Sequence, residues 1–230
     1  MLEISNFSND ILSHINFKLK DSENLIILGS NGAGKSTLAK LLCGITPNHN
    51  TKLFGKYLDK INTYERAKLI NYIPPKLDIF DEYITLYEYL ELSRLNSQLT
   101  INDVLSILHI QHLKDKSCKT LSSGESQLML LSSAILHNAE ITIFDEPTSN
   151  LDTNHIVKIY ELLKSNHFKN RIVITHDLNL AYRLGYKILH ITDGKIDFFD
   201  DNSQFFEPNN IQNTFGNSVK KVNQYYVVNL

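Results

Sequence analysis

A glycine-rich stretch, Gly29–Thr37, carries the residues best suited to chemistry. It reads Gly-Ser-Asn-Gly-Ala-Gly-Lys-Ser-Thr and fits the pattern of glycine, any four residues, then Gly-Lys-Ser. Glycines let the backbone wrap a string of phosphate oxyanions so that successive N–H groups point inward. We expect the Lys35 ammonium to reach the β- and γ-phosphates and the Ser36 hydroxyl to ligate Mg²⁺. The stretch therefore predicts a loop that binds a nucleoside triphosphate with Mg²⁺. Its predicted ligand-binding residues are Gly29, Ser30, Asn31, Gly32, Ala33, Gly34, Lys35, Ser36 and Thr37.

Two adjacent carboxylates, Asp145 and Glu146, follow the apolar run Ile141–Phe144. A carboxylate at the end of a buried strand is costly to desolvate unless it has a partner. Beside a phosphate-binding loop, Asp145 is expected to hold the Mg²⁺ shell. Glu146 is then available to orient the attacking water or to accept its proton. The pair predicts a hydrolytic site.

His176 directly follows another apolar run, Arg171–Thr175. Open parallel sheets bind ligands at the carboxyl ends of their strands, so this side chain is expected at the same site. A single histidine can also be a structural residue whose ring nitrogens are satisfied by neighbours. Its position at the strand end favours a functional role.

Two further segments leave alternatives open. Leu121–Glu125, Leu-Ser-Ser-Gly-Glu, precedes an apolar helix that Ser122 or Ser123 can cap. The alternative is a second phosphate site, since a capped helix N-terminus with a glycine attracts anions. Phe7, in a polar surrounding, either packs in the core or stacks on a nucleobase.

The elements that must position these residues predict an α/β fold with a mostly parallel sheet. Leu25–Leu28 is expected to be a buried strand and Leu38–Cys43 a helix, and strand–loop–helix is the context that confirms such a loop. The remaining predictions are strands at 15–19, 71–73, 141–144 and 171–175, helices at 63–70 and 153–170, and a hairpin at 187–199 that turns at Asp193-Gly194.

Residues 76–120 differ from the rest, because glycine is absent between Lys56 and Ser123 and leucines recur at helical spacing. This pattern predicts a helical insert on the α/β core. Tyr83, Tyr87 and Tyr89 lie within it. We expect them to be half-buried or in the core, with a partner-facing patch as the alternative.

Composition sets further bounds. The 230 residues carry 42% hydrophobic residues and a net charge of −2, which suits a globular protein and gives no reason to expect a nucleic-acid partner. Cys43 and Cys118 suggest neither a disulfide framework nor a metal site. No signal peptide or membrane-spanning run is recognisable, so a cytosolic chain is expected.

Together these segments resemble an ATP-binding-cassette (ABC) ATPase over nearly the whole chain. Gly29–Thr37 is similar to the Walker A motif, Ile141–Glu146 to Walker B and Ser149–Asp152 to the D-loop. His176 is similar to the switch histidine. Leu121–Glu125 is similar to the signature motif, with Ser123 and Glu125 in place of the usual glycine and glutamine.

The resemblance implies a single domain over 1–230. It has a P-loop core with an N-terminal antiparallel β subdomain and a helical subdomain inserted at about 76–135. The implied cofactors are ATP and Mg²⁺, with Ser36 and Asp145 on the metal. Glu146 and His176 are the implied catalytic residues. Phe7 falls about where the family has its base-stacking aromatic. Ser122, Ser123, Gly124 and Glu125 would hold the ATP of a second subunit, identical to this one, in a head-to-tail dimer.

The stretch 64–74 and the tail segments Phe215–Val219 and 226–228 are similar to importers of the iron–siderophore, haem and cobalamin type. An importer ATPase works peripherally on the inner face of the cell membrane through a permease. One position departs from the family: Pro75 stands where a glutamine is usual, which puts the coupling of insert and core in question. The alternatives are a soluble assembly ATPase, for example in iron–sulfur cluster formation, and a nucleotide-gated clamp that hydrolyses weakly.

Overall fold

Six strands form the central sheet, paired in the order β10-β9-β3-β8-β7-β6. They are β3 (Leu25–Leu28), β6 (Ile70–Ile73), β7 (Ile141–Asp145), β8 (Asn170–Thr175), β9 (Lys187–Thr192) and β10 (Lys195–Asp200). All neighbours pair in parallel except β10, which forms the predicted hairpin with β9. The computed structural model describes residues 1–77, 79 and 81–229. The mostly parallel α/β sheet is confirmed.

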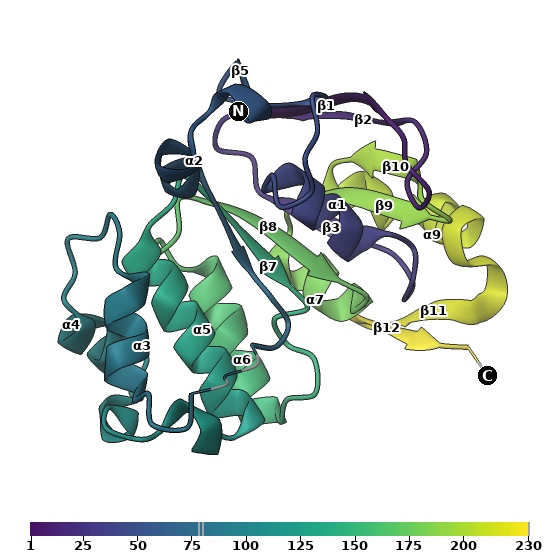
Figure 1. Cartoon of the computed structure of the whole chain (residues 1–230). Helices are drawn as coiled ribbons and strands as arrows, with labels where there is room; N and C mark the ends of the chain where they lie inside the picture. Colours follow the sequence, from purple (N-terminus) through teal and green to yellow (C-terminus); the bar gives the residue numbers. More distant parts are fainter. Residues whose placement is uncertain (78, 80, 230) are drawn as a thin grey trace.

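The side chains of alternating residues in the buried strands pack into two separate cores, one on each face of the sheet. Leu25 and Ile27 of β3 belong to one core, together with the helix α1 (Lys35–Leu42). Ile26 and Leu28 belong to the other, which includes the helix α5 (Ser123–His137). Because strand side chains alternate between faces, the all-apolar run Leu25–Leu28 requires helices on both sides (Figure 1).

A second, antiparallel sheet covers α1, with strand order β2-β1-β4-β5. Its strands are β1 (Leu2–Phe7), β2 (Ile15–Leu19), β4 (Thr51–Leu53) and β5 (Lys56–Tyr57). This confirms the predicted N-terminal β subdomain. Phe7 is only 9% exposed and belongs to the core beneath this sheet. The ring therefore packs in the core, the first of the two alternatives, and stacking on a nucleobase stays a prediction.

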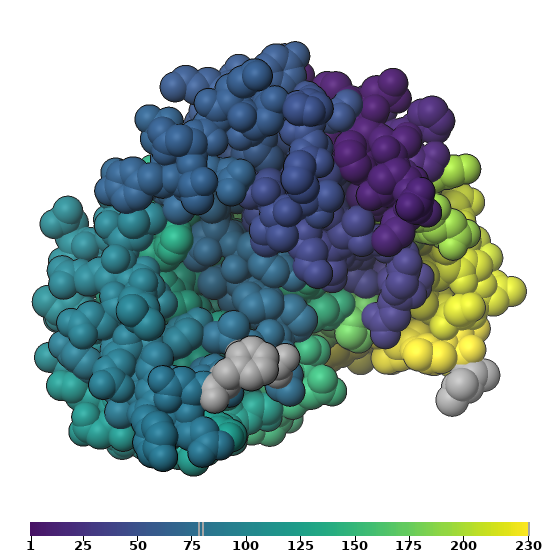
Figure 2. Space-filling model, in the orientation of Figure 1, coloured from purple at the N-terminus to yellow at the C-terminus, as the bar shows by residue number. Residues whose placement is uncertain are grey.

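The predicted insert consists of α3 (Leu86–Ser93), α4 (Ile101–Ile107) and the first part of α5, connected by short turns. Capping boxes begin all three helices, at Thr85, Thr100 and Ser122. Tyr87 and Tyr89 are partly buried as expected, but Tyr83 is 86% exposed. Figure 2 shows this region as the teal lobe, away from the yellow C-terminal residues. Positions 78 and 80 of the insert lie outside the described residues.

The helices α6 (Thr153–Lys164) and α7 (Leu178–Leu184) pack in the core, whereas α2 (Thr63–Leu69) has no fully buried residue. The predicted helix over 153–170 is too long, because α6 ends at Lys164 and Phe168 packs edge-on against Phe144. No described helix has the length and apolar character needed to cross a bilayer.

The C-terminal residues, whose pattern was uninformative, form α8 (Asn202–Phe205), α9 (Pro208–Phe215) and the hairpin of β11 (Val219–Val222) and β12 (Tyr225–Val228). The Asn179 side chain binds the backbone of this hairpin to α7. Asn179 accepts a bond from the Tyr226 backbone N–H (2.8 Å) and donates to the Tyr226 carbonyl (3.0 Å). The ring of Tyr226 is buried against Tyr182 and Phe206.

We predict that Asn179→Ala loosens this hairpin, because both Tyr226 backbone groups lose their partner. The expected loss is about 1–3 kcal/mol of unfolding free energy, with faster amide hydrogen exchange over 219–228. Asn154→Ala is the matched control, since Asn154 holds the same second helical position in α6 and is exposed. Equal exchange in the two variants would contradict this role of Asn179.

Candidate functional site

The glycine loop joins β3 to α1 and depends on glycine at two close approaches. A Cβ on Gly29 would lie 2.4 Å from the Ile191 carbonyl oxygen. Gly34 caps α1 with φ +103°, and a Cβ there would lie 2.7 Å from the Leu12 side chain. Both positions exclude larger residues. A cavity of about 450 Å³ lies over the loop, lined by Ile11, Asn31, Gly32, Gly34, Lys35, Ser36, Thr37 and Glu146.

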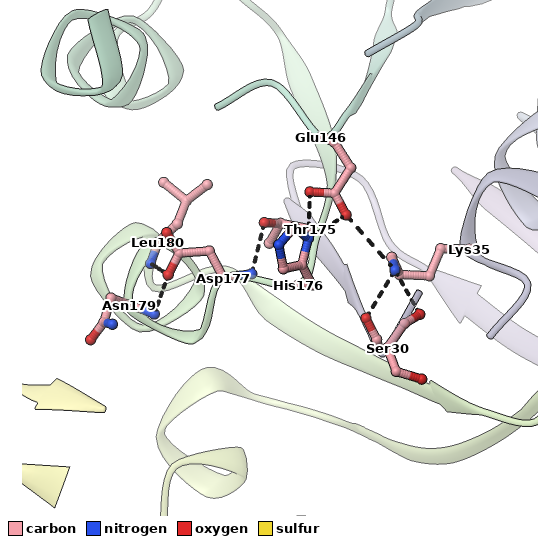
Figure 3. Close-up of polar contacts among 9 residues, drawn as sticks. Ser30, Lys35, Glu146, Thr175, His176, Asp177, Asn179 and Leu180 are labelled. Carbon is pink, nitrogen blue, oxygen red and sulfur yellow. Dashed lines mark hydrogen bonds and ion pairs between the residues drawn. The ribbon is translucent and has the colours of Figure 1, made fainter. Parts of the chain in front are cut away.

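The Lys35 side chain is only 6% exposed and lies along the loop. Its ammonium donates to the carbonyl oxygens of Gly29 and Ser30, both at 2.9 Å. The same nitrogen lies 3.8 Å from the Glu146 carboxylate (Figure 3). A buried ammonium held by these groups is a strong point charge for an anion in the cavity.

Glu146 lies between the lysine and the histidine. Its carboxylate is 2.9 Å from His176 Nδ1, and both side chains point into the same space in Figure 3. The Glu146 backbone has φ +48°, a conformation uncommon for a residue other than glycine, and its N–H donates to the Ile174 carbonyl. Strained backbone of this kind concentrates at functional sites. The structure thus brings together three sequence-predicted residues, Lys35, Glu146 and His176.

The turn after His176 fixes its backbone. Asp177 accepts hydrogen bonds from the backbone N–H groups of Asn179 and Leu180 and so caps α7. The Asp177 N–H in turn donates to the Thr175 hydroxyl at 3.0 Å. The His176 side chain itself remains 55% exposed. A fixed backbone with an exposed ring suits a residue that contacts a ligand.

Asp145, next to Glu146, is 1% exposed. The Tyr72 hydroxyl donates to its Oδ2 at 2.7 Å, whereas its Oδ1 has no partner among the described residues. Burial, and secondarily the bond to Asp145, raises the pKa of Tyr72, so the phenol stays protonated as a donor. The buried Oδ1 has no partner in the described part of the chain, and the Ser36 side chain at the loop is exposed. Carboxylate and hydroxyl oxygens of this kind are hard donors that fit Mg²⁺.

Tyr72 was missed from the sequence. A buried phenol usually has a hydrogen-bond partner. A tyrosine in the short strand β6, next to a strand that ends in an aspartate, could therefore have indicated this bond. Ile11 was also missed. It is 51% exposed at the rim of the loop cavity.

The predicted second phosphate site is formed by the N-terminus of α5. Ser122 caps α5, with Glu125 completing a capping box, so the capping interpretation holds. Lys116 holds the pKa of Glu125 below its usual range through an ion pair at 2.8 Å. None of Ser122, Ser123, Gly124 and Glu125 is among the described residues that line the loop cavity.

Gly124 contacts the start of α6. A Cβ there would lie 2.5 Å from the His155 ring, whose Nδ1 is 2.7 Å from the Asp152 carboxylate. This pairing with the His155 N–H and ring lowers the pKa of Asp152. The two sequence segments, 121–125 and 149–152, are therefore neighbours in one chain.

Comparison with known proteins identifies relatives over most of the chain. A family model described as ABC transporter matches residues 12–149. The zinc import ATP-binding protein ZnuC of Buchnera aphidicola is 32% identical, over 87% of this chain and 84% of its own length. The hemin import ATP-binding protein HmuV of Aliivibrio fischeri is 33% identical, over 82% and 78%. A solved ATP-binding subunit of an ABC transporter superposes with a TM-score of 0.77 at 23% identity, covering 94% of this chain and 93% of that one.

We predict that Lys35→Ala abolishes most triphosphate binding, because the loop loses its buried point charge. The measurement is the Kd of a fluorescent ATP analogue. Lys40→Ala is the matched control, since Lys40 is an exposed lysine on the same helix. Binding by Lys35→Ala as tight as that of the control would refute the phosphate site.

Proposed function

The chain is an ATPase of the ABC transporter family, and on that premise we propose that it hydrolyses ATP as the motor subunit of a membrane importer. The observation that carries the proposal is the cluster of Lys35, Glu146 and His176 at the loop cavity, beside the buried Asp145. The sequence similarity to importer subunits supports the transport role.

In the proposed mechanism, the loop N–H groups and Lys35 bind the triphosphate and neutralise charge on its β- and γ-phosphates. Ser36 and Asp145 would hold Mg²⁺, which supplies further charge neutralisation during transfer. Glu146 orients a water toward the γ-phosphorus and accepts its proton. The water oxygen forms a bond to the γ-phosphorus while the bond from phosphorus to the bridging oxygen breaks, and ADP leaves with that electron pair. His176, hydrogen-bonded to Glu146, holds the carboxylate toward the γ-phosphate position.

We propose that the ATP site is completed by a second copy in head-to-tail orientation, through Ser122, Ser123, Gly124 and Glu125. The chain's own copy of this segment is not among the described residues that line its loop cavity, which supports contribution from a partner. Whether the partner is identical is open to direct test by the mass of the ATP-bound dimer.

For the substrate, we propose metal ions and metal-containing compounds. The named relatives import zinc and hemin. The iron–siderophore, haem and cobalamin compounds expected from the 64–74 and C-terminal segments belong to this same wider class. The permease would place the chain on the inner face of the membrane.

The proposed permease surface is the groove of Asp81, Tyr83, Ile84, Glu88, Glu91 and Leu92, with a cavity of about 480 Å³. Tyr83 and Leu92 are large hydrophobic residues, yet they are 86% and 80% exposed. The three carboxylates favour a basic partner segment. Exposed apolar side chains within a charged rim are typical of a protein interface.

Two alternatives remain distinguishable. A soluble assembly ATPase would purify without a membrane protein. A nucleotide-gated clamp would dimerise on ATP but turn it over weakly even in its assembled complex. Pro75 is the feature that favours the clamp, since proline lacks both the side-chain amide of glutamine and a backbone N–H.

We predict that Glu146→Gln keeps ATP affinity but lowers hydrolysis about 10²–10⁴-fold, the usual contribution of a general base. The variant should also accumulate as an ATP-bound dimer in size-exclusion chromatography. Glu161→Gln, on the surface of α6, controls for loss of a carboxylate. If Glu146→Gln hydrolyses ATP as fast as wild type, Glu146 is not the general base. His176 is then the next candidate.

We predict that Tyr83→Ala/Leu92→Ala keeps basal ATPase activity but loses stimulation by the permease, because the groove loses its apolar contacts. Tyr64→Ala is the control, since this tyrosine is 61% exposed on α2, outside the groove. The ATPase rate of each protein is measured alone and with the permease reconstituted in vesicles. Full stimulation of the double variant would exclude the groove as the docking surface.

A further inference from the structure

Tyr72 is connected to the metal-holding carboxylate by the register of two neighbouring strands. In the β6–β7 pair, Tyr72 lies opposite Ile143. Asp145 is two residues beyond Ile143, so it lies on the same face of the sheet. A long aromatic side chain can span that offset, and the Tyr72 hydroxyl meets Asp145 Oδ2 at 2.7 Å.

The hydrogen bond from Tyr72 makes the two carboxylate oxygens of Asp145 differ in their partners. Oδ2 accepts from the phenol, while Oδ1 is buried without a partner in the described part of the chain. A buried carboxylate without a fixed donor could rotate about its side-chain bonds and exchange the two oxygens. The phenol hydrogen is directed to Oδ2, so Tyr72 acts on the carboxylate.

We propose that Tyr72 is a positioning residue that holds Asp145 with Oδ1 directed to the Mg²⁺ shell of bound ATP. The inference rests on the proposed function, because it requires Mg²⁺ and ATP at this site. Hydrogen bonds that orient metal-binding carboxylates commonly change metal affinity by 10–100-fold. The strand β6 would thus contribute to the metal site through Tyr72 although Pro75, after its end, offers no side-chain amide.

The test is Tyr72→Phe, which removes one hydroxyl and keeps the ring. We expect unchanged affinity for a fluorescent ATP analogue in EDTA, because the glycine loop and Lys35 are intact. Added Mg²⁺ should tighten binding of the analogue. In Tyr72→Phe, the Mg²⁺ concentration needed for half of this effect should be about tenfold higher than in wild type. Tyr186→Phe is the matched control, since its phenol donates to the Leu163 carbonyl of the α6 helix.

A second background separates positioning from a general loss of packing. In Asp145→Asn, the Mg²⁺ response should already be weak, and adding Tyr72→Phe should change it no further. The double variant also provides a folded reference if the single Tyr72→Phe is unstable, because the unpaired buried charge is gone. Circular dichroism melting is recorded for each protein.

Two outcomes would overturn the proposal: an unchanged Mg²⁺ response in Tyr72→Phe, or an equal further loss in the Asp145→Asn background. In both cases, ATP binding by wild type leaves the proposed function intact. Failure of wild type to bind ATP with or without Mg²⁺ would refute the proposed function itself, so the two failures are distinguishable.

Discussion

The parallel pairing of β3, β7 and β8 is the constraint on which the whole site depends. In this register Leu28 lies opposite Thr175, so the next residues on each strand, Gly29 and His176, emerge side by side. Asp145 lies opposite Ile174 on the other flank of β8. The carboxyl ends of three strands thereby deliver the loop, the acidic pair and the histidine to one edge. A one-residue slip would direct each of these side chains to the opposite face.

The charges gathered at that edge stabilise one another. Lys35 is buried and would be costly to desolvate alone, yet it has two carbonyl partners and the Glu146 carboxylate nearby. Glu146 in turn is held between Lys35 and His176 despite its positive φ, which costs of order 1 kcal/mol or more. The Glu146 N–H bond to Ile174 fixes that backbone. An arriving triphosphate would compete for the lysine and leave Glu146 to the histidine and to water.

The local motifs could be predicted from the sequence because each is contiguous. Gly29–Thr37, the run before Asp145 and the hairpin at Asp193-Gly194 specify their own backbone through glycines, apolar runs and turn residues. Tyr72 could not be assigned, because its bond to Asp145 joins positions 73 residues apart and depends on strand register. For Phe7, packing and stacking both stayed open, because a lone aromatic in a polar stretch does not reveal that its ring faces the core. The position of the C-terminal hairpin likewise depends on distant side chains, among them Asn179 and Tyr182.

The N-terminus of α5 has backbone N–H groups that are available to bind an anion. The capping box uses the Ser122 hydroxyl and the Glu125 N–H, and the first helical turn uses the Ser126 N–H. The N–H groups of Ser123 and Gly124 are the remaining donors of that turn, since the first N–H groups of a helix have no partner within it. Lys116 offsets the charge of Glu125 beside them. Because a Cβ at Gly124 would meet His155, its glycine serves close packing against α6 as well as access to the backbone. Glu125, in place of the usual glutamine, is therefore compatible with anion binding at the α5 N-terminus. A phosphate bound there would lie close to the start of α6, the helix that follows residues 149–152.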